Sequence, residues 1–168
     1  MAEKSILFSD PMIKAILDGR KTMTRRVLNP NKLHNGFAFD DPRIACGCPY
    51  GKPGDTLWVR ETFSVNCIDD KISVFYRADC GSDGDGAKWK PSIFMPRKHS
   101  RINLHITEVR TERLQAISEA DAIAEGIEHD PHVRTWLKFA ALWNRINEKR
   151  GYGWDANPWV WVVSFEKV

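Results

Sequence analysis

The hydrophobic pattern of this chain consists of short apolar runs separated by turn-forming residues. Between residues 102 and 107, apolar and polar side chains alternate with a period of two, which is typical of a half-buried strand. Residues 159–165 form a strongly apolar run that predicts a final strand. Three further strands are predicted, at residues 6–8, 56–60 and 72–77. Residues 30–55 are rich in proline and glycine and therefore predict an irregular connection.

Two helices are predicted from apolar stripes that are bounded by helix-end signals. The first begins with Asp10 as its N-cap and Pro11 at the first helical position. It ends at Gly19, since glycine suits a left-handed C-cap. The second opens at Ser118, in a sequence that resembles a capping box, and stops at Gly126.

A third, longer helix is expected after Pro131, and Gly151 closes it. Its apolar side chains recur at helical spacing, so they are expected to form one buried stripe. The members of this stripe are Trp136, Phe139, Ala140, Trp143 and Ile146. Five or six short strands with three helices predict an α+β fold around a small, partly closed barrel. The chain has 168 residues and no internal repeat, so a single domain over residues 1–168 is expected.

Composition narrows the class of protein. The sequence is 42% hydrophobic and 28% charged, as is usual for a soluble globular protein. No apolar run approaches the roughly 20 residues of a membrane span, and the N-terminus lacks the apolar stretch of a secretory signal. We therefore expect a cytoplasmic protein without a membrane partner. The oligomeric state stays open, with a monomer favoured.

The cysteines are expected to be reduced thiols, because the chain has no export signal. They are Cys46, Cys48, Cys67 and Cys80. A zinc site that also uses His99 or His105 is the alternative. However, the cysteine spacing matches no paired Cys-x-x-Cys motif. The sequence therefore predicts neither a metal site nor a cofactor.

Positive charge is concentrated in two segments, although the net charge is only +3. The first cluster consists of Arg20, Lys21, Arg25, Arg26 and Lys32. The second consists of Lys88, Lys90, Arg97, Lys98 and Arg101, with Trp89 and Phe94 between them. Basic groups among aromatic rings suit a phosphate chain with unstacked bases. The alternative is a pair of solvated surface segments.

Catalytic chemistry is suggested by residues 19–26. Standard hydrolase, phosphate-loop, zinc-protease and zinc-deaminase motifs are absent from the sequence. A threonine hydroxyl becomes a nucleophile when a base takes its proton, and a lysine with a lowered pKa can be that base. Lys21 has cationic neighbours on both sides, which disfavour its ammonium form. The alternative is that these cations bind phosphate and that the nearby threonines are ordinary strand residues.

Two carboxylates are further site candidates. Glu125 occupies the last position of its predicted helix, where the helix dipole disfavours a negative charge. A residue placed against its local preference is a candidate for function, although exposed glutamates at helix ends are also common. Glu61 directly follows the predicted strand 56–60 and is a candidate for binding a base edge or a ribose.

Several segments together resemble the ASCH domain family, and specifically its bacteriophage and prophage members. The resemblance rests on Gly-Arg-Lys-Thr-Met-Thr-Arg-Arg at 19–26, on Pro-Tyr-Gly-Lys-Pro-Gly-Asp-Thr-Leu-Trp-Val-Arg-Glu at 49–61, and on Pro-Ser-Ile-Phe-Met-Pro-Arg at 91–97. It continues through Ser100 to Ile102 and through Arg113, Leu114 and Ile117 to Gly126. It implies a PUA-like small mixed β-barrel with flanking helices and a cleft beside the first helix.

The resemblance also implies activities. The family is regarded as RNA-binding in general, some members are reported as ribonucleases, and a smaller bacterial relative deacylates N4-acetylcytidine. The catalytic lysine, threonine and glutamate of that relative correspond to Lys21, Thr24 and Glu125. Segments 30–55 and 64–100 are longer here than in the relative, and a longer cover over the cleft can change the substrate or occlude it.

Two functions follow from these observations. In the first, the chain is an amidohydrolase on N4-acylated cytidine, with Thr24 as nucleophile, Lys21 as base and Glu125 orienting Lys21. In the second, it is a non-catalytic or weakly ribonucleolytic module that binds single-stranded RNA. Metal-free cleavage of RNA by the same cations is a third possibility. The residues expected to contact a nucleoside or RNA are Arg20, Arg25, Arg26, Trp58, Glu61, Arg97, Lys98 and Arg101.

Overall fold

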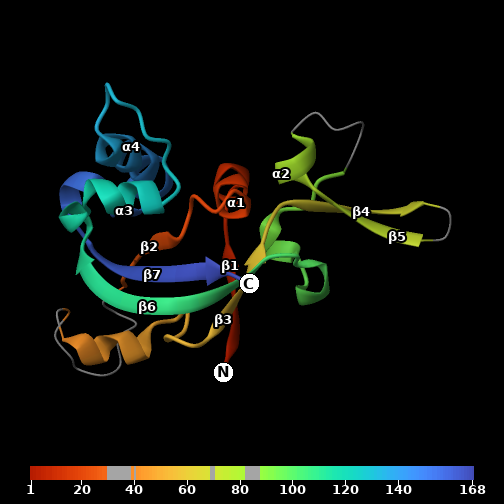
Figure 1. Cartoon of the computed structure of the whole chain (residues 1–168), viewed down its shortest axis with the longest axis horizontal. Helices are drawn as coiled ribbons and strands as arrows, with labels where there is room; N and C mark the ends of the chain where they lie inside the picture. Colours follow the sequence, from red (N-terminus) through yellow and green to blue (C-terminus); the bar gives the residue numbers. More distant parts are fainter. Residues whose placement is uncertain (30–38, 40, 69–70, 82–87) are drawn as a thin grey trace.

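The central element is a five-stranded mixed sheet with the strand order β1–β3–β6–β7–β2. The structure is a computed structural model that describes residues 1–29, 39, 41–68, 71–81 and 88–168. The strands of the sheet are β1 (Glu3–Leu7), β2 (Met23–Val27), β3 (Thr56–Arg60), β6 (Asn103–Arg113) and β7 (Trp159–Lys167). β1 and β3 are parallel, whereas the other neighbouring strands are antiparallel. The long strands β6 and β7 curve together along the sheet (Figure 1).

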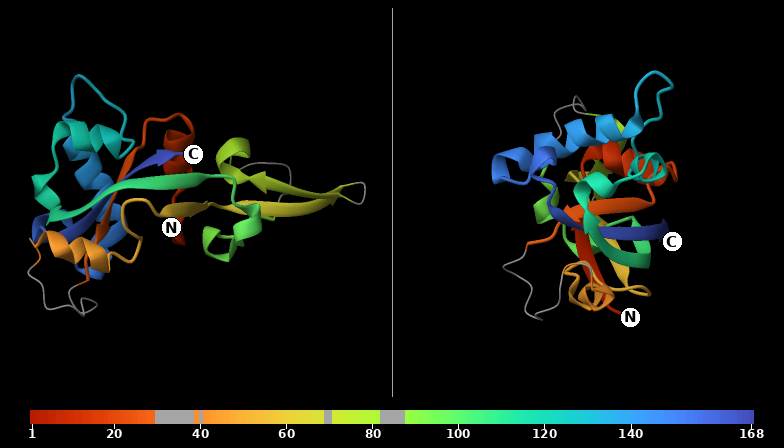
Figure 2. Two further views of the ribbon diagram at one scale, coloured as in Figure 1. Left: turned by 60° about the horizontal axis from the view of Figure 1, so that its bottom comes forward. Right: turned by 90° about the vertical axis from the view of Figure 1, so that its left-hand side faces the viewer.

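Helices cover the sheet at two places. Helix α1 (Asp10–Leu17) lies near the middle of the molecule, and α3 (Glu119–Ala124) and α4 (Thr135–Asn147) lie together at one end (Figures 1 and 2). The shorter helical turns are α2 (Arg77–Cys80), η2 (Pro42–Gly47), η3 (Ser92–Phe94), η4 (Arg97–His99), η5 (Leu114–Ala116), η6 (Glu148–Arg150) and η7 (Trp154–Ala156). The α+β class predicted from the sequence is confirmed. Part of the predicted irregular connection, at 30–38 and 40, lies outside the described residues.

A separate hairpin of β4 (Phe63–Ile68) and β5 (Lys71–Tyr76) projects from the sheet (Figures 1 and 2). At its base, Phe63 and Lys90 exchange two backbone hydrogen bonds of 3.2 and 2.7 Å. The Tyr76 hydroxyl donates to the backbone oxygen of His99 at 2.9 Å. The sequence pattern predicted β5 but not β4. The predicted run 72–77 was one residue too late, because Arg77 already begins α2.

Strand β7 separates two hydrophobic cores. Its alternating side chains point to opposite faces, so Trp161, Val163 and Phe165 join one core while Val160 and Val162 join the other. The first core packs α1 against β1, β3 and β6, and the second packs α3 and α4 against β7. Because β2 pairs with β7 in register, its side chains also divide between the two faces.

The predicted helix ends are partly right. Ser118 caps α3, since its hydroxyl oxygen accepts a 3.0 Å hydrogen bond from the Asp121 amide, and Gly126 follows with φ of +87°. At α1 the prediction was wrong by one residue, because the N-cap is Ser9 and Asp10 is already helical. The Asp10 carboxylate binds Arg77 at 2.6 Å and makes no capping bond, so its role is an ion pair between α1 and α2.

Helix α4 begins later than the sequence suggested, at Thr135. Its first backbone amide donates to the Glu119 carboxylate of α3 at 2.9 Å, so a residue of another helix caps it. Within the predicted stripe, Phe139 and Trp143 are buried as expected. Ile146 is 59% exposed, which contradicts the prediction. It lies in the last turn of the helix, where it lines the mouth of the cleft described below and packs into neither core.

Candidate active site

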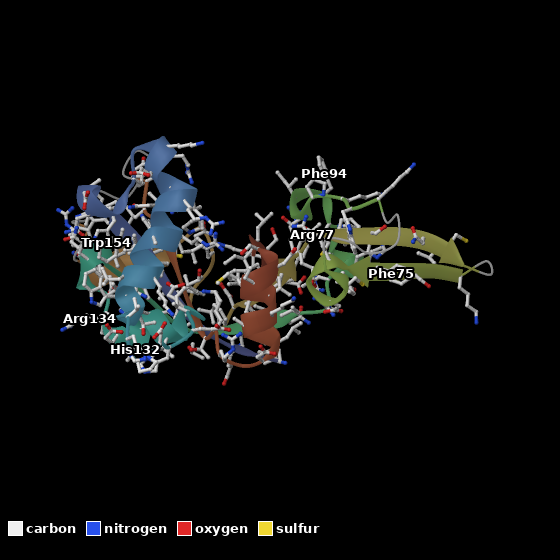
Figure 3. The ribbon with its side chains drawn as sticks, turned by 90° about the horizontal axis from the view of Figure 1, so that it is seen from above. Phe75, Arg77, Phe94, His132, Arg134 and Trp154 are labelled. Carbon is white, nitrogen blue, oxygen red and sulfur yellow. The ribbon has the colours of Figure 1, made fainter. Side chains whose placement is uncertain are left out.

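A cleft of about 550 Å³ lies between α1 and α4, with β2 along its base. This volume is within the range of small-molecule sites, about 300–1,000 Å³. The β1–α1 junction forms one wall, where Phe8 and Met12 reach it, and α4 forms the other with residues from Phe139 to Asn147. The two helices stand next to each other when the molecule is seen from above (Figure 3). Within the described residues, the longer segments of this chain line the cleft through Tyr50, Arg77 and Ser92.

Lys21 and Glu125 form a buried ion pair in this cleft. Their side chains are 2% and 6% exposed, and the Lys21 Nζ lies 2.8 Å from Glu125 Oε2. The same nitrogen donates to the backbone oxygens of Glu125 and Met23, at 2.8 and 2.7 Å. Three acceptors thus surround one amine.

Local backbone structure brings the pair together. The chain leaves α1 through Gly19, which has φ of +74°, and the Lys21 amide then bonds to the Ala15 carbonyl at 2.9 Å. Lys21 and Glu125 form an isolated antiparallel bridge. Gly126 follows immediately, and an added Cβ there would lie 2.9 Å from the Cβ of Lys21. The end of α1 and the end of α3 are therefore fixed against each other at the site.

Burial controls the pKa of Lys21. Loss of hydration lowers the pKa of this amine below its ordinary value of 10.5, because a buried ammonium ion is poorly solvated. The charge and hydrogen bond of Glu125 oppose this shift, and the nearby cations Arg26 and Arg25 reinforce it. The neighbouring cations considered in the sequence analysis therefore contribute, but burial is the larger cause.

Thr24 lies on β2 and lines the same cleft. It pairs with Val163 of β7, and the residue is only 4% exposed. Within the described part of the chain its hydroxyl makes no hydrogen bond, either to Lys21 or to any other group. Catalytic hydrogen bonds are often formed only once substrate is bound, so this resting geometry leaves the hydroxyl available.

Arg25 points to the opposite face of β2, towards α3. Its side chain is 0% exposed and contacts three carboxylates, those of Glu112, Asp121 and Glu125. Arg110 binds the first two of these carboxylates as well, at 3.4 and 3.2 Å. From the sequence, Arg25 was expected to contact substrate or RNA. The structure surrounds it with acidic groups of the protein.

Arg26 and Phe8 form the part of the cleft nearest to Lys21. Arg26 donates to the backbone oxygen of Leu7 at 2.6 Å, and its guanidinium carbon lies 5.1 Å from the centre of the Phe8 ring. The Lys21 nitrogen is 5.5 Å from the same ring centre. An aromatic face beside two cations is a cation–π arrangement, and it also offers an apolar surface to a flat ligand. The sequence pattern placed Phe8 in a strand and gave no signal for this role.

The other predicted contact residues do not line the cleft. Arg20 is exposed and pairs with Asp18 at 3.2 Å. The remaining five lie around the junction between the sheet and the hairpin: Trp58, Glu61, Arg97, Lys98 and Arg101. Four of the six are already paired within the protein. Besides Arg20, Arg97 pairs with Glu3, and Arg101 binds both oxygens of Glu61.

Trp58 and Lys98 differ from Glu61, Arg97 and Arg101 in that they form no ion pair with the described residues. The Trp58 ring lies near two guanidinium groups, those of Arg60 at 4.7 Å and Arg97 at 5.9 Å. Lys98 is exposed and has no ion pair with the described residues. The exposed Phe94 lies in the same region, on the side of α1 that faces the hairpin (Figure 3).

No three His, Cys, Asp or Glu side chains of the described residues are grouped so as to hold a metal ion. Cys48 is buried, and Cys67 and Cys80 are exposed. In the part of the chain that the structure covers, no helix has the length and apolar character needed to cross a lipid bilayer.

Two solved structures have a similar architecture. One is the ASCH domain from Lactobacillus crispatus JV V101, which is 14% identical with a TM-score of 0.52, covering 99% of this chain and 79% of that one. The other is protein EF3133 from Enterococcus faecalis V583, of the DUF984 family, which is 14% identical with a TM-score of 0.51, covering 100% of this chain and 80% of that one. No protein-family model and no curated protein matches the sequence. The chain therefore has an α+β fold similar to that of an ASCH domain, as expected from its sequence motifs.

Proposed function

We propose that the protein is an amidohydrolase that removes acyl groups from the exocyclic amine of N4-acylated cytidine. The observation that carries the proposal is the buried Lys21–Glu125 ion pair, at 2.8 Å, in a cleft that Thr24 also lines. Buried ionisable groups with perturbed pKa values that converge in a cleft are typical of catalytic sites. The apolar walls with a few polar groups at the base suit a small, flat, partly polar ligand.

The reaction begins with attack of the Thr24 hydroxyl oxygen on the amide carbonyl carbon, while neutral Lys21 takes the hydroxyl proton. The carbon–nitrogen bond then breaks. Lys21 returns the proton to the departing N4 nitrogen, which leaves cytidine with a free amine and an acyl ester on Thr24.

Water completes the cycle. Lys21 takes a proton from a water molecule while the water oxygen attacks the ester carbonyl carbon. The ester bond to Thr24 then breaks, Lys21 gives the proton to the threonine oxygen, and the carboxylic acid leaves. Glu125 holds the amine of Lys21 at the site throughout, because its carboxylate accepts a hydrogen bond from that amine.

The test is spectroscopic hydrolysis of N4-acetylcytidine by the wild type and by Lys21→Ala and Thr24→Ala. We expect both variants to lower kcat by a factor of about 100 or more, since each removes a group that acts in the transition state. Thr22→Ala is the matched control, because Thr22 is an exposed neighbour that does not line the cleft. It should keep wild-type turnover. Equal turnover by Lys21→Ala, Thr24→Ala and the wild type would exclude this mechanism.

Binding of single-stranded RNA is the alternative function. Its support is the exposed Lys98, which has no ion pair within the described part of the chain, together with Phe94, which is 69% exposed. A lysine beside an exposed ring suits a phosphate and a stacked base. If the wild type hydrolyses no N4-acylated cytidine but binds RNA with an affinity that falls steeply with salt, the alternative is the better description.

A further inference from the structure

Arg25 is a fully enclosed cation of the site, and its partners come from several parts of the chain. Its Nε and Nη2 bind Glu112 of β6, and its Nη2 also lies 2.6 Å from Asp121 of α3. Its Nη1 lies 3.4 Å from Glu125 Oε1, at the end of α3. With its side chain 0% exposed, the guanidinium has no open face for a phosphate of a bound nucleic acid.

The Glu125 carboxylate lies between two cations. One oxygen, Oε2, accepts from Lys21 at 2.8 Å, and the other, Oε1, faces Arg25 at 3.4 Å. A carboxylate held at both oxygens keeps one orientation. Arg25 is also one of the residues that line the cleft, and its side chain is linked to Lys21 through the Glu125 carboxylate.

Resting on the function proposed above, we propose that Arg25 is a positioning residue of the hydrolase site. It holds the Glu125 carboxylate in one orientation, and its positive charge offsets part of the effect of that carboxylate on Lys21. This role replaces the contact with nucleic acid that the sequence suggested for Arg25.

Loss of Arg25 has a defined electrostatic consequence. Glu112, Asp121 and Glu125 would face one another with Arg110 as the remaining arginine, and Arg110 contacts only the first two. The Glu125 charge would then act more strongly on Lys21 and raise its pKa, since Arg25 itself also lowers that pKa now. The other charged or titratable groups lining the cleft stay in place: Arg26, Arg77, Arg150 and Tyr50.

The experiment compares Arg25→Met and Arg25→Lys with the wild type. The first readout is the pH dependence of N4-acetylcytidine hydrolysis, and the second is the pKa of Lys21 itself, followed by NMR of labelled lysine side chains. We expect Arg25→Met to lower kcat about tenfold or more with little change in KM. The acidic limb of its pH profile and its Lys21 pKa should both rise by about one unit. Arg25→Lys should reverse most of this shift.

Arg110→Met is the matched control. Arg110 binds the same Glu112 and Asp121 but does not contact Glu125, so this variant disturbs the network without removing the proposed link. It should lower thermal stability and leave the acidic limb in place. If Arg25→Met does not fold, Arg25→Gln, which keeps hydrogen-bond donors but not the charge, should show the same upward shift.

Two results would overturn the role of Arg25. A rise in KM with an unmoved acidic limb would make it a substrate contact, and an unchanged Lys21 pKa in Arg25→Met or Arg25→Gln would remove the link to Lys21. The NMR titration needs no turnover. A wild type that hydrolyses nothing therefore refutes the hydrolase function, while the titration still decides whether Arg25 controls Lys21.

Discussion

At the residue scale, Lys21 is the most constrained group in the molecule. Its nitrogen has three hydrogen-bond acceptors within 2.8 Å, which together match the three hydrogens of an ammonium ion. Burial has the opposite effect, because it disfavours the charge. A neutral amine has only two hydrogens to donate, so loss of a proton would leave one of the three acceptors facing its lone pair. The hydrogen bonds thus favour the ammonium ion, whereas burial favours the neutral amine.

This balance predicts a pH dependence of stability. Folding lowers the pKa of Lys21 below 10.5, so between the two values the unfolded chain binds more protons than the folded one. The free energy of unfolding therefore rises with pH in that window, by at most about 1.4 kcal/mol per pH unit. The free energies of unfolding of the wild type and of Lys21→Met can be measured by urea denaturation from about pH 7 to about pH 10. As the pH rises, the value for the wild type should increase relative to that for Lys21→Met. Parallel curves would mean that Lys21 titrates normally.

Sequence alone could mark Lys21 and Thr24 as site candidates but could not show how Arg25 is enclosed. The first two lie in one short motif, whereas the partners of Arg25 are 87, 96 and 100 residues away along the chain. A run of basic residues has the same appearance whether its members meet solvent or carboxylates. Only the fold distinguishes Arg25, which is enclosed, from Lys98, which is exposed.

At the element scale, the site depends on how closely α1 and α3 approach each other. Gly126 ends α3 at the point of contact, and a Cβ there would lie 2.9 Å from the Cβ atoms of both Ala15 and Lys21. Its φ of +87° is a second constraint, because residues with a Cβ rarely adopt that conformation. Gly126 thus has both a conformational and a packing reason to be glycine.

Gly126→Ala should therefore destabilise the protein and reduce its activity. We expect a loss of about 2–4 kcal/mol in the free energy of unfolding, from backbone strain plus overpacking. Gly151→Ala is the matched control, since Gly151 also ends a helical turn with positive φ, +81°, but a Cβ there would meet nothing within 4 Å. Chemical denaturation should give a smaller loss for Gly151→Ala. Equal losses would show that the contact with Lys21 has no energetic weight.

Some helix ends could be predicted from the sequence pattern and others could not. Ser118 and Gly126 were predicted correctly because capping depends on residues within one turn. The start of α4 was not, since its cap is Glu119, 16 residues earlier in the chain. The exposure of Ile146 has the same origin: helical spacing identifies one face of a helix, but not where the neighbouring elements stop covering it.

At the scale of the whole molecule, an ion-pair cluster joins the sheet to the projecting hairpin. Glu61, at the end of β3, is fully buried and receives both of its hydrogen bonds from Arg101. Arg101 also binds Asp79 of α2 and lies 3.9 Å from the ring centre of Tyr76 in β5. One arginine thus connects three elements and neutralises a buried carboxylate. From the sequence, Glu61 and Arg101 were expected to bind a ligand.

Arg101→Met should lower the free energy of unfolding by about 3–5 kcal/mol, because it leaves Glu61 buried without a counter-charge. The double variant Arg101→Met with Glu61→Gln should lose less than Arg101→Met alone, since it removes the unpaired charge. Urea denaturation measures both. If the free-energy losses of Arg101→Met and Glu61→Gln simply add in the double variant, the Arg101–Glu61 ion pair makes no specific contribution to stability. In Arg101→Met, amide hydrogen exchange should rise first in β4 and β5, because these strands form the hairpin that the cluster joins to the sheet.

The position of β2 at the margin of the sheet has a consequence for synthesis on the ribosome. Its only strand neighbour in the described residues is β7, whose residues 159–167 are made more than 130 residues after Thr24. During translation β2, which carries Thr24, lacks this strand pairing until β7 has been synthesised. A nascent chain that stalls before residue 159 would contain Lys21 and Thr24 but not the strand that holds β2 in the sheet.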